Sequence, residues 1–167
     1  ASTQQRGFAF RLHQFISRGD TAYASLEDPA ARHITLNGQK FVPNDRDKIL
    51  LPLAFCRECG QEYYVIRRFT DKKTDNMVVV PRGLTDQASE EDNENGFLYA
   101  NRENPWSDDQ DELIDNERLP EDWLEQTSGG GYRVKRDQRK KLPQPIRVNP
   151  LGEADAQGEL YHFVQSP

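Results

Sequence analysis

The sequence has no long apolar stretch and few apolar residues in total. Hydrophobic residues make up 35% of its 167 positions, below the roughly 45–50% of typical globular chains, so we expect a modest core. No segment approaches the roughly 18 consecutive apolar residues that a membrane-spanning helix needs. The N-terminus has no apolar signal region. We therefore expect a cytoplasmic protein of one domain, with no membrane partner.

Cysteine is nearly absent from the chain. The two cysteines, Cys56 and Cys59, lie three positions apart. Such a pair cannot cross-link distant parts of a secreted fold, and its spacing favours metal or redox chemistry inside a cell. The sequence therefore excludes a disulfide-rich scaffold.

The common catalytic motifs are missing as well. The chain has no nucleophile elbow, no phosphate-binding loop and no H-E-x-x-H helix. Its acidic run at 108–112 resembles a calcium loop only loosely, because the alternating ligands, the central glycine and the final glutamate are not at the required spacing. The sequence therefore predicts a non-catalytic part of a larger protein and no complete active site.

Charge is distributed in blocks along the chain. The net charge is −6, yet residues 86–126 alone hold 15 acidic and 2 basic side chains, a net of −13. Residues 132–147 hold 7 basic and 1 acidic side chain, a net of +6. The blocks therefore say more about partners than the whole-chain average does.

Most of the chain has the apolar patterns and turn signals of β-strands. The sequence predicts a hairpin from 8–16 and 21–26, and a second hairpin from 33–36 and 40–42 around the Asn37-Gly38 turn. Further strands are predicted at 48–55, 62–69, 77–80, 97–99, 146–148 and 159–164, with Pro52 marking an edge strand or a bulge in the first of these. Pro120 followed by acidic residues predicts one short helix near 120–126.

These patterns give a mostly β fold with minor α content (α+β). We expect an antiparallel sheet with a C-x-x-C knuckle, a long acidic loop and one short helix. One domain is expected to contain three parts. Residues 1–83 form a β-rich part with the zinc-ribbon-like knuckle, 84–131 an acidic insertion, and 132–167 a basic extended segment with a final strand that returns to the sheet.

The run from Phe55 to Tyr64 contains the sharpest motif. Two thiolates at C-x-x-C spacing can face one ion, and the glycine that follows suits a backbone bend with positive φ. A structural zinc needs four ligands, so Cys56 and Cys59 would supply half a site. Two alternatives remain: an inert turn with ordinary thiols, and a redox pair. The three histidines (His13, His33 and His162) are scattered, which favours a second cysteine pair outside this chain.

Two regions are candidates for nucleic-acid contact. On a regular strand, Arg11 and His13 share one face, which could meet a nucleic-acid backbone. A dense basic segment follows the glycines at 129–131, and its cations could track phosphates without reading sequence. Its candidate residues are Arg133, Lys135, Arg136, Arg139, Lys140 and Lys141. The alternative for both regions is a solvated polar surface, and the acidic block could screen the basic segment.

The runs at 10–27 and 52–64 resemble a segment of very large bacterial superfamily 2 DEAD/DEAH-box helicases. These helicases have a cysteine-rich C-terminal region and occur in phage-defence systems such as DISARM and Druantia. The resemblance covers mainly residues 8–68 and, more weakly, 119–167. It implies a zinc-ribbon-like accessory segment beside two RecA-like motor domains.

The same resemblance implies that a second C-x-x-C-G follows a strand like 161–164 and a proline, beyond Pro167. The sequence departs from the family in one respect, because it contains neither the phosphate-binding loop nor the D-E-x-H box of the motor. ATP binding and hydrolysis would therefore belong to the parent protein, as would contact with DNA or RNA through the neighbouring motor domains.

The leading hypothesis is an accessory domain of a nucleic-acid helicase or translocase, which braces the motor and contacts the strand. The alternative is a protein-interaction module that docks a partner subunit through the acidic block, Trp106 and Trp123. An enzyme that uses cysteine chemistry is the third reading.

Overall fold

The computed structural model describes residues 12–13, 21–57, 59–87, 93–101 and 103–166, with the side chains of 12–13 left out. Over these residues ten strands form one antiparallel sheet, and two more form a separate hairpin. The sheet strands are β1 (Leu12–His13), β2 (Tyr23–Ser25), β3 (Ile34–Thr35), β4 (Phe41–Val42), β5 (Asp45–Cys56), β6 (Glu62–Asp71), β7 (Asn76–Pro81), β8 (Glu94–Tyr99), β11 (Gln144–Val148) and β12 (Glu159–Gln165). The other elements are α1 (Gln110–Asp115), the hairpin strands β9 (Leu124–Gln126) and β10 (Tyr132–Val134), and two 3₁₀ turns at Glu121–Trp123 and Arg139–Lys141.

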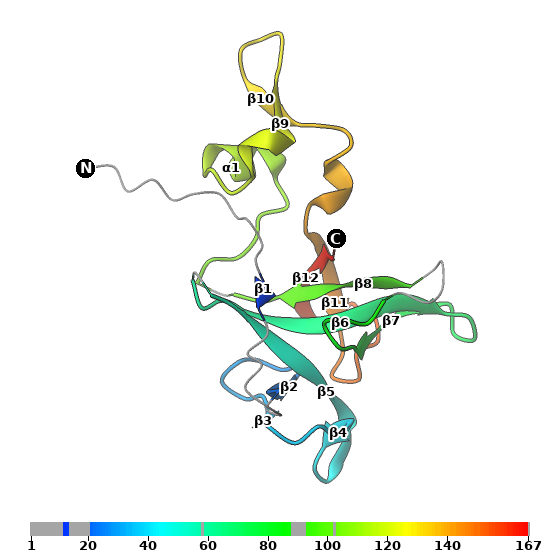
Figure 1. Cartoon of the computed structure of the whole chain (residues 1–167). Coiled ribbons are helices and arrows are strands. Elements are labelled where there is room, and N and C mark those ends of the chain that lie inside the picture. The colour runs from blue at the N-terminus through cyan, green and yellow to red at the C-terminus, as the bar shows by residue number, and fades with distance from the viewer. Residues whose placement is uncertain (1–11, 14–20, 58, 88–92, 102, 167) are drawn as a thin grey trace.

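The sheet follows the order β11-β12-β8-β6-β5-β2-β3, and its middle strands are buried on both faces. Along β6, Tyr63 and Val65 face one cluster of buried side chains, while Tyr64 and Ile66 face the other. This alternation follows from the two-residue period of a strand. Figure 1 shows α1, β9 and β10 above the sheet, while β2, β3 and β4 extend the sheet at the lower end of β5.

The longest strand, β5, changes partners along its length. Its first part pairs with β2 and β4, and its last part pairs with β6 and β1. The ladder with β6 ends at Leu53↔Tyr64, and Pro52 lies one residue beyond it, opposite Tyr23 of β2. A proline is tolerated here because it lies past the end of the β6 ladder. Pro52 therefore marks the change of partner within an inner strand of the sheet, and the prediction of an edge strand is wrong.

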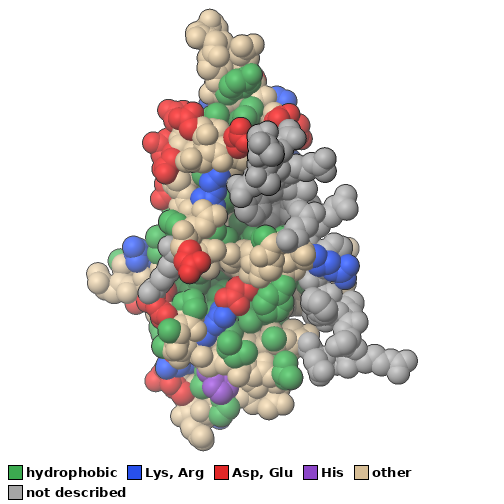
Figure 2. All heavy atoms as spheres, turned by 90° about the vertical axis from the view of Figure 1, so that its left-hand side faces the viewer, with side chains coloured by type: hydrophobic (Ala, Val, Ile, Leu, Met, Phe, Trp, Pro, Cys, Tyr) green, Lys and Arg blue, Asp and Glu red, His purple; other side chains and the backbone are tan. Residues whose placement is uncertain are grey.

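The acidic part of the chain packs on the upper face. Asp109 caps α1 by accepting a hydrogen bond from the amide of Asp111, as expected for a helix start. Leu113 of α1 is 2% exposed and shares a buried cluster with Trp106. Figure 2 shows acidic side chains gathered over the end of the molecule that carries these elements. None of the described helices is long and apolar enough to cross a membrane.

The structure confirms the predicted fold class, which is mostly antiparallel β with a small helical content. The predicted strands at 62–69, 77–80, 97–99, 146–148 and 159–164 all lie within observed strands. The expected helix near 120–126 is wrong: one 3₁₀ turn is followed at once by β9. The α-helix lies earlier, at Gln110–Asp115.

Both predicted hairpins have other pairings. The strands that flank Asn37-Gly38 do not pair with each other, because β3 pairs with β2 and β4 pairs with β5. Over the described residues, β1 pairs with β5 and has no ladder with β2. The rest of the predicted 8–16 strand lies outside the described residues.

Candidate functional site

A cysteine knuckle joins β5 to β6. Its turn is closed by two backbone hydrogen bonds, from the Gly60 amide to the Cys56 carbonyl and from the Cys56 amide to the Gln61 carbonyl, both 2.8 Å long. Gly60 has a φ of 73°, which a side chain would strain. The expected glycine bend is therefore present, and it returns the chain directly into β6.

The two thiols are reduced and lie within hydrogen-bonding reach of each other. Cys59 is exposed and Cys56 is half-buried. Burial raises the pKa of the Cys59 thiol and the Cys56 sulfur raises it further, while the Gln61 amide stabilises the thiolate. Two sulfurs so placed could share one soft or borderline metal ion once both are deprotonated.

The described residues bring no third or fourth protein ligand to this pair. No group of three or more His, Cys, Asp or Glu side chains within them could hold a metal ion. His162 is 6% exposed, and its Nε2 lies 3.2 Å from an Asp108 carboxylate oxygen. His33 is half-buried in the loop that leads into β3. Neither histidine completes a site with the two cysteines, and the side chain of His13 lies outside the description.

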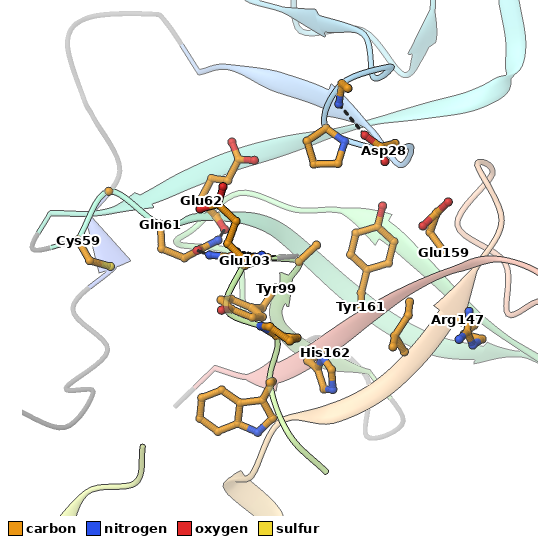
Figure 3. A pocket seen from close by; sticks show the side chains of 18 residues that line it. Asp28, Cys59, Gln61, Glu62, Tyr99, Glu103, Arg147, Glu159, Tyr161 and His162 are labelled. Atoms are coloured by element: carbon orange, nitrogen blue, oxygen red, sulfur yellow. Dashed lines mark hydrogen bonds between the residues drawn. The ribbon is translucent and has the colours of Figure 1, made fainter. Parts of the chain in front are cut away.

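A groove of about 680 Å³ begins at the knuckle and runs across the end of the sheet (Figure 3). Three walls from distant parts of the sequence enclose it: the loop at 28–30, the knuckle and start of β6 at 59–62, and the chain at 159–162 in β12. The groove is also lined by the last residue of β8 and by residues that follow it: Tyr99, Ala100, Asn101, Glu103, Pro105 and Trp106. Sequence patterns gave no sign of this groove, because its walls meet only in the folded sheet.

A polar network holds the 28–30 wall against the sheet. Arg32 donates to Glu62 at 2.8 Å and to the Tyr64 hydroxyl at 3.3 Å, and that hydroxyl donates to the Ser25 carbonyl at 2.8 Å. The Arg32 side chain is only 8% exposed. Burial opposes its charge, yet the bonds to Glu62 and Tyr64 outweigh burial and raise its pKa. The wall is therefore fixed before any ligand arrives.

The groove has a negative lining. It contains the carboxylates of Asp28, Glu62, Glu103 and Glu159 and one guanidinium, that of Arg147. Even when the ion pair between Arg32 and Glu62 is counted, acidic groups outnumber basic ones. A phosphate backbone would be repelled here, and a cationic ligand would be attracted.

The basic segment begins in β10 and runs from there to β11. Arg133 is paired with Glu125 at 2.7 Å, and the Lys135 ammonium donates to the Asp122 carbonyl at 2.7 Å. The Lys141 ammonium lies 5.8 Å from the centre of the Trp123 ring. Three of the six predicted contacts in this segment therefore already have partners within the acidic block.

Three exposed cations of this segment have no acidic partner among the described residues. Arg136, Arg139 and Lys140 are exposed, and no described acidic side chain forms an ion pair with them. Arg139 has only a long hydrogen bond, 3.5 Å, to the Val134 carbonyl. The predicted Arg11 contact lies outside the described residues.

The tryptophans are not free for docking. Trp106 is 8% exposed and lies under the Arg118 guanidinium, and Trp123 is half-buried. The exposed large apolar side chains among the described residues are instead Ile34, Leu36, Tyr132 and Leu160. Of these, Leu160 lines the groove.

The chain matches no protein-family model, no curated protein and no solved structure.

Proposed function

We propose that this chain is a non-catalytic accessory domain of a larger cytoplasmic ATP-dependent helicase or translocase, in which it contacts the nucleic-acid backbone. The resemblance of its N-terminal half to phage-defence helicases motivates the parent, whose motor domains would bind ATP. The observation that carries the proposal is the exposure of three cations close together in the sequence, Arg136, Arg139 and Lys140. Neighbouring cations without an acidic partner among the described residues fit phosphates, and they track a strand without reading its sequence.

The acidic block would tune this contact. Glu125 holds Arg133 across the β9–β10 hairpin, with Cα atoms directly paired. Each phosphate contact by Arg133 therefore has to compete with an intramolecular carboxylate. Such a competitor lowers the affinity for phosphate, which suits a surface that must let a moving strand slide.

Binding of the full chain to a fluorescent oligothymidylate, measured by anisotropy over a series of salt concentrations, tests the contact. Replacing two exposed cations, Arg136→Gln with Lys140→Gln, should weaken binding and lower the slope of log K against log salt by about 1.4, since each single-strand phosphate contact contributes about 0.7. The matched control, Lys72→Gln with Lys73→Gln, changes the same charge in the exposed β6–β7 turn and should leave the slope unchanged.

A second variant tests the competition directly. Glu125→Gln releases Arg133 without adding a positive charge to the basic segment, so it should tighten binding. Equal loss in the two double variants would show only a response to net charge and would contradict the proposal, as would binding independent of salt.

The knuckle would serve as an anchor in the parent protein. Two thiolates alone bind zinc weakly, and we propose that two further ligands come from a neighbouring segment of polypeptide. Cobalt(II) titration of this chain should give no tetrahedral thiolate spectrum, whereas adding a peptide that contains a second C-x-x-C should produce one, and Cys59→Ser should abolish it. A full tetrahedral spectrum from the chain alone would contradict the half-site.

A further inference from the structure

Among the described residues, one strand of the sheet has a stretch at the groove with a ladder on one side only. β12 pairs with β11 from Glu159 to Phe163, but its ladder with β8 covers only His162 to Gln165. The reason is that β8 ends at Tyr99, where the chain turns out of the sheet. Within the described residues, the first part of β12 therefore has a neighbour on one side only, and its other side forms a wall of the groove.

The backbone groups of Leu160 point to that open side. The Asp155 amide donates to the Arg147 carbonyl, and the Asn149 amide donates to the Glu153 carbonyl. The backbone groups of Arg147 and Asn149, at the end of β11, therefore point away from β12. In an antiparallel ladder, neighbouring residues direct their groups to opposite sides. The backbone amide and carbonyl of Val148, which lies opposite Glu159, therefore face β12. Those of Leu160, the residue after Glu159, face the groove.

The other wall offers matching features. Glu62 begins β6, and its ladder with β8 starts only at Tyr63↔Tyr99. The Gln61 side chain donates to the Glu62 carbonyl at 2.8 Å, in the position that a longer β8 would occupy. Figure 3 shows Glu62 and Gln61 on one side of the groove and Tyr161 with Glu159 on the other. The groove is thus a slot at the end of β8, and it is open to one further extended segment.

We propose that this slot binds an extended polypeptide segment that bears lysine or arginine and adds as a short strand beside Leu160. The backbone amide and carbonyl of Leu160 supply the hydrogen bonds, as in other cases of strand addition. Its side chain is 44% exposed and gives an apolar contact at the same position. The carboxylates of Asp28, Glu103 and Glu159 surround the slot and select the cationic side chains.

The chemistry of the slot favours a peptide over nucleic acid. A phosphate chain would meet four carboxylates and one guanidinium, and it would leave the Leu160 carbonyl without a donor. A strand of polypeptide donates amides to that carbonyl and places alternate side chains on the two faces of the sheet. The Arg32 network fixes the opposite wall in advance, which lowers the entropic cost of binding.

Amide hydrogen exchange on the full chain tests the open edge. In the free protein the Leu160 amide should exchange fast, while the amides of Tyr161 and His162, paired with β11 and β8, should be protected. Adding a short peptide in which lysine and valine alternate should slow exchange at Leu160. The same peptide with glutamate in place of lysine should have no effect.

Two variants separate charge from fold. Glu103→Lys should weaken binding of the lysine peptide by roughly three- to tenfold, because it replaces an attractive charge at the rim with a repulsive one. Glu121→Lys makes the same change outside the groove, at an exposed position, and should bind as the parent chain does. A lysine peptide N-methylated at alternate amides on its hydrogen-bonding edge should not bind. If the attraction were purely electrostatic, this methylated peptide would still bind.

Several outcomes would overturn the proposal. One is a Leu160 amide that is already protected in the free monomer, and another is protection that rises with protein concentration through self-association. Equal effects of Glu103→Lys and Glu121→Lys, or perturbation of the slot by oligothymidylate in place of the peptide, would do the same. None of these results bears on the basic segment, so the slot and the nucleic-acid contact can fail separately.

Discussion

Tyr64→Phe removes one oxygen from the network that holds the groove wall. The hydroxyl is buried, donates to the Ser25 carbonyl at 2.8 Å and accepts from Arg32 at 3.3 Å. Arg32 keeps its bond to Glu62 in the variant, so the main loss is the donor to the Ser25 carbonyl. A buried hydrogen bond lost in this way costs about 1–2 kcal/mol of unfolding free energy. In a chain of this length, each kcal/mol of lost unfolding free energy lowers Tm by about 2–4 °C.

Urea unfolding followed by tryptophan fluorescence at neutral pH measures this difference as a shift in midpoint with unchanged slope. Tyr132→Phe is the matched control, because Tyr132 is 58% exposed and the same change there should stay within about 0.5 kcal/mol. Equal midpoints for the two variants would refute the role given to the hydroxyl. The Tyr64 variant should also shift the backbone resonances of Ala30 in the groove wall, while the Tyr132 variant should not.

Three further predictions concern the sheet and the knuckle. Gly96→Ala should destabilise the fold by about 1–3 kcal/mol in the same urea assay, because the new Cβ would lie 2.4 Å from the Phe163 ring and from the Val164 carbonyl oxygen. Gly129→Ala is the control, since its Cβ would meet nothing within 4 Å and the loss of stability should be far smaller. Burial raises the pKa of Tyr63 and Tyr161. Their contribution to stability is therefore complete below the unfolded value of about 10 and falls as pH rises above it. Tyrosinate absorbance during alkaline unfolding, compared with that of Tyr63→Phe and Tyr161→Phe, measures this. Ionisation of these two tyrosines near pH 10 in the folded protein would contradict the prediction. The raised pKa of Cys59 should keep its alkylation slow at neutral pH despite its exposure, and rapid labelling there would argue for a depressed value.

The parts of the fold that the sequence predicted are those with a strong local period. The observed β6, β7 and β12 contain the predicted strands because their β-branched and aromatic residues favour extended structure on a buried surface. The helix α1 was missed because Leu113 is its one buried residue, so no apolar stripe identifies it. Its cap at Asp109 was a usable signal, but the acidic block was interpreted as a loop.

Pairing partners and the groove depend on contacts between distant residues. Asn37-Gly38 is a strong local hairpin signal, yet β2 and β5 offer longer partners to its flanks, and tertiary pairing outweighs the turn. The open edge at Leu160 exists only because β8 ends while β12 continues, which no local pattern encodes. Of the predicted site, the bend at Gly60 is observed, whereas the partners of Arg133 and Lys135 could not be predicted from the sequence.

The alternation along β6 limits where this protein can be altered. Tyr63 and Val65 belong to one buried cluster and Tyr64 and Ile66 to the other, so neither face of the strand is spare. Inserting a single residue there would exchange the two sets and disrupt both clusters at once. The turn at 72–75 carries no such constraint, because its residues are exposed beyond the last rung of the ladder. Tags, labels or grafted loops are therefore best inserted in that turn, which leaves the slot and the basic segment unchanged.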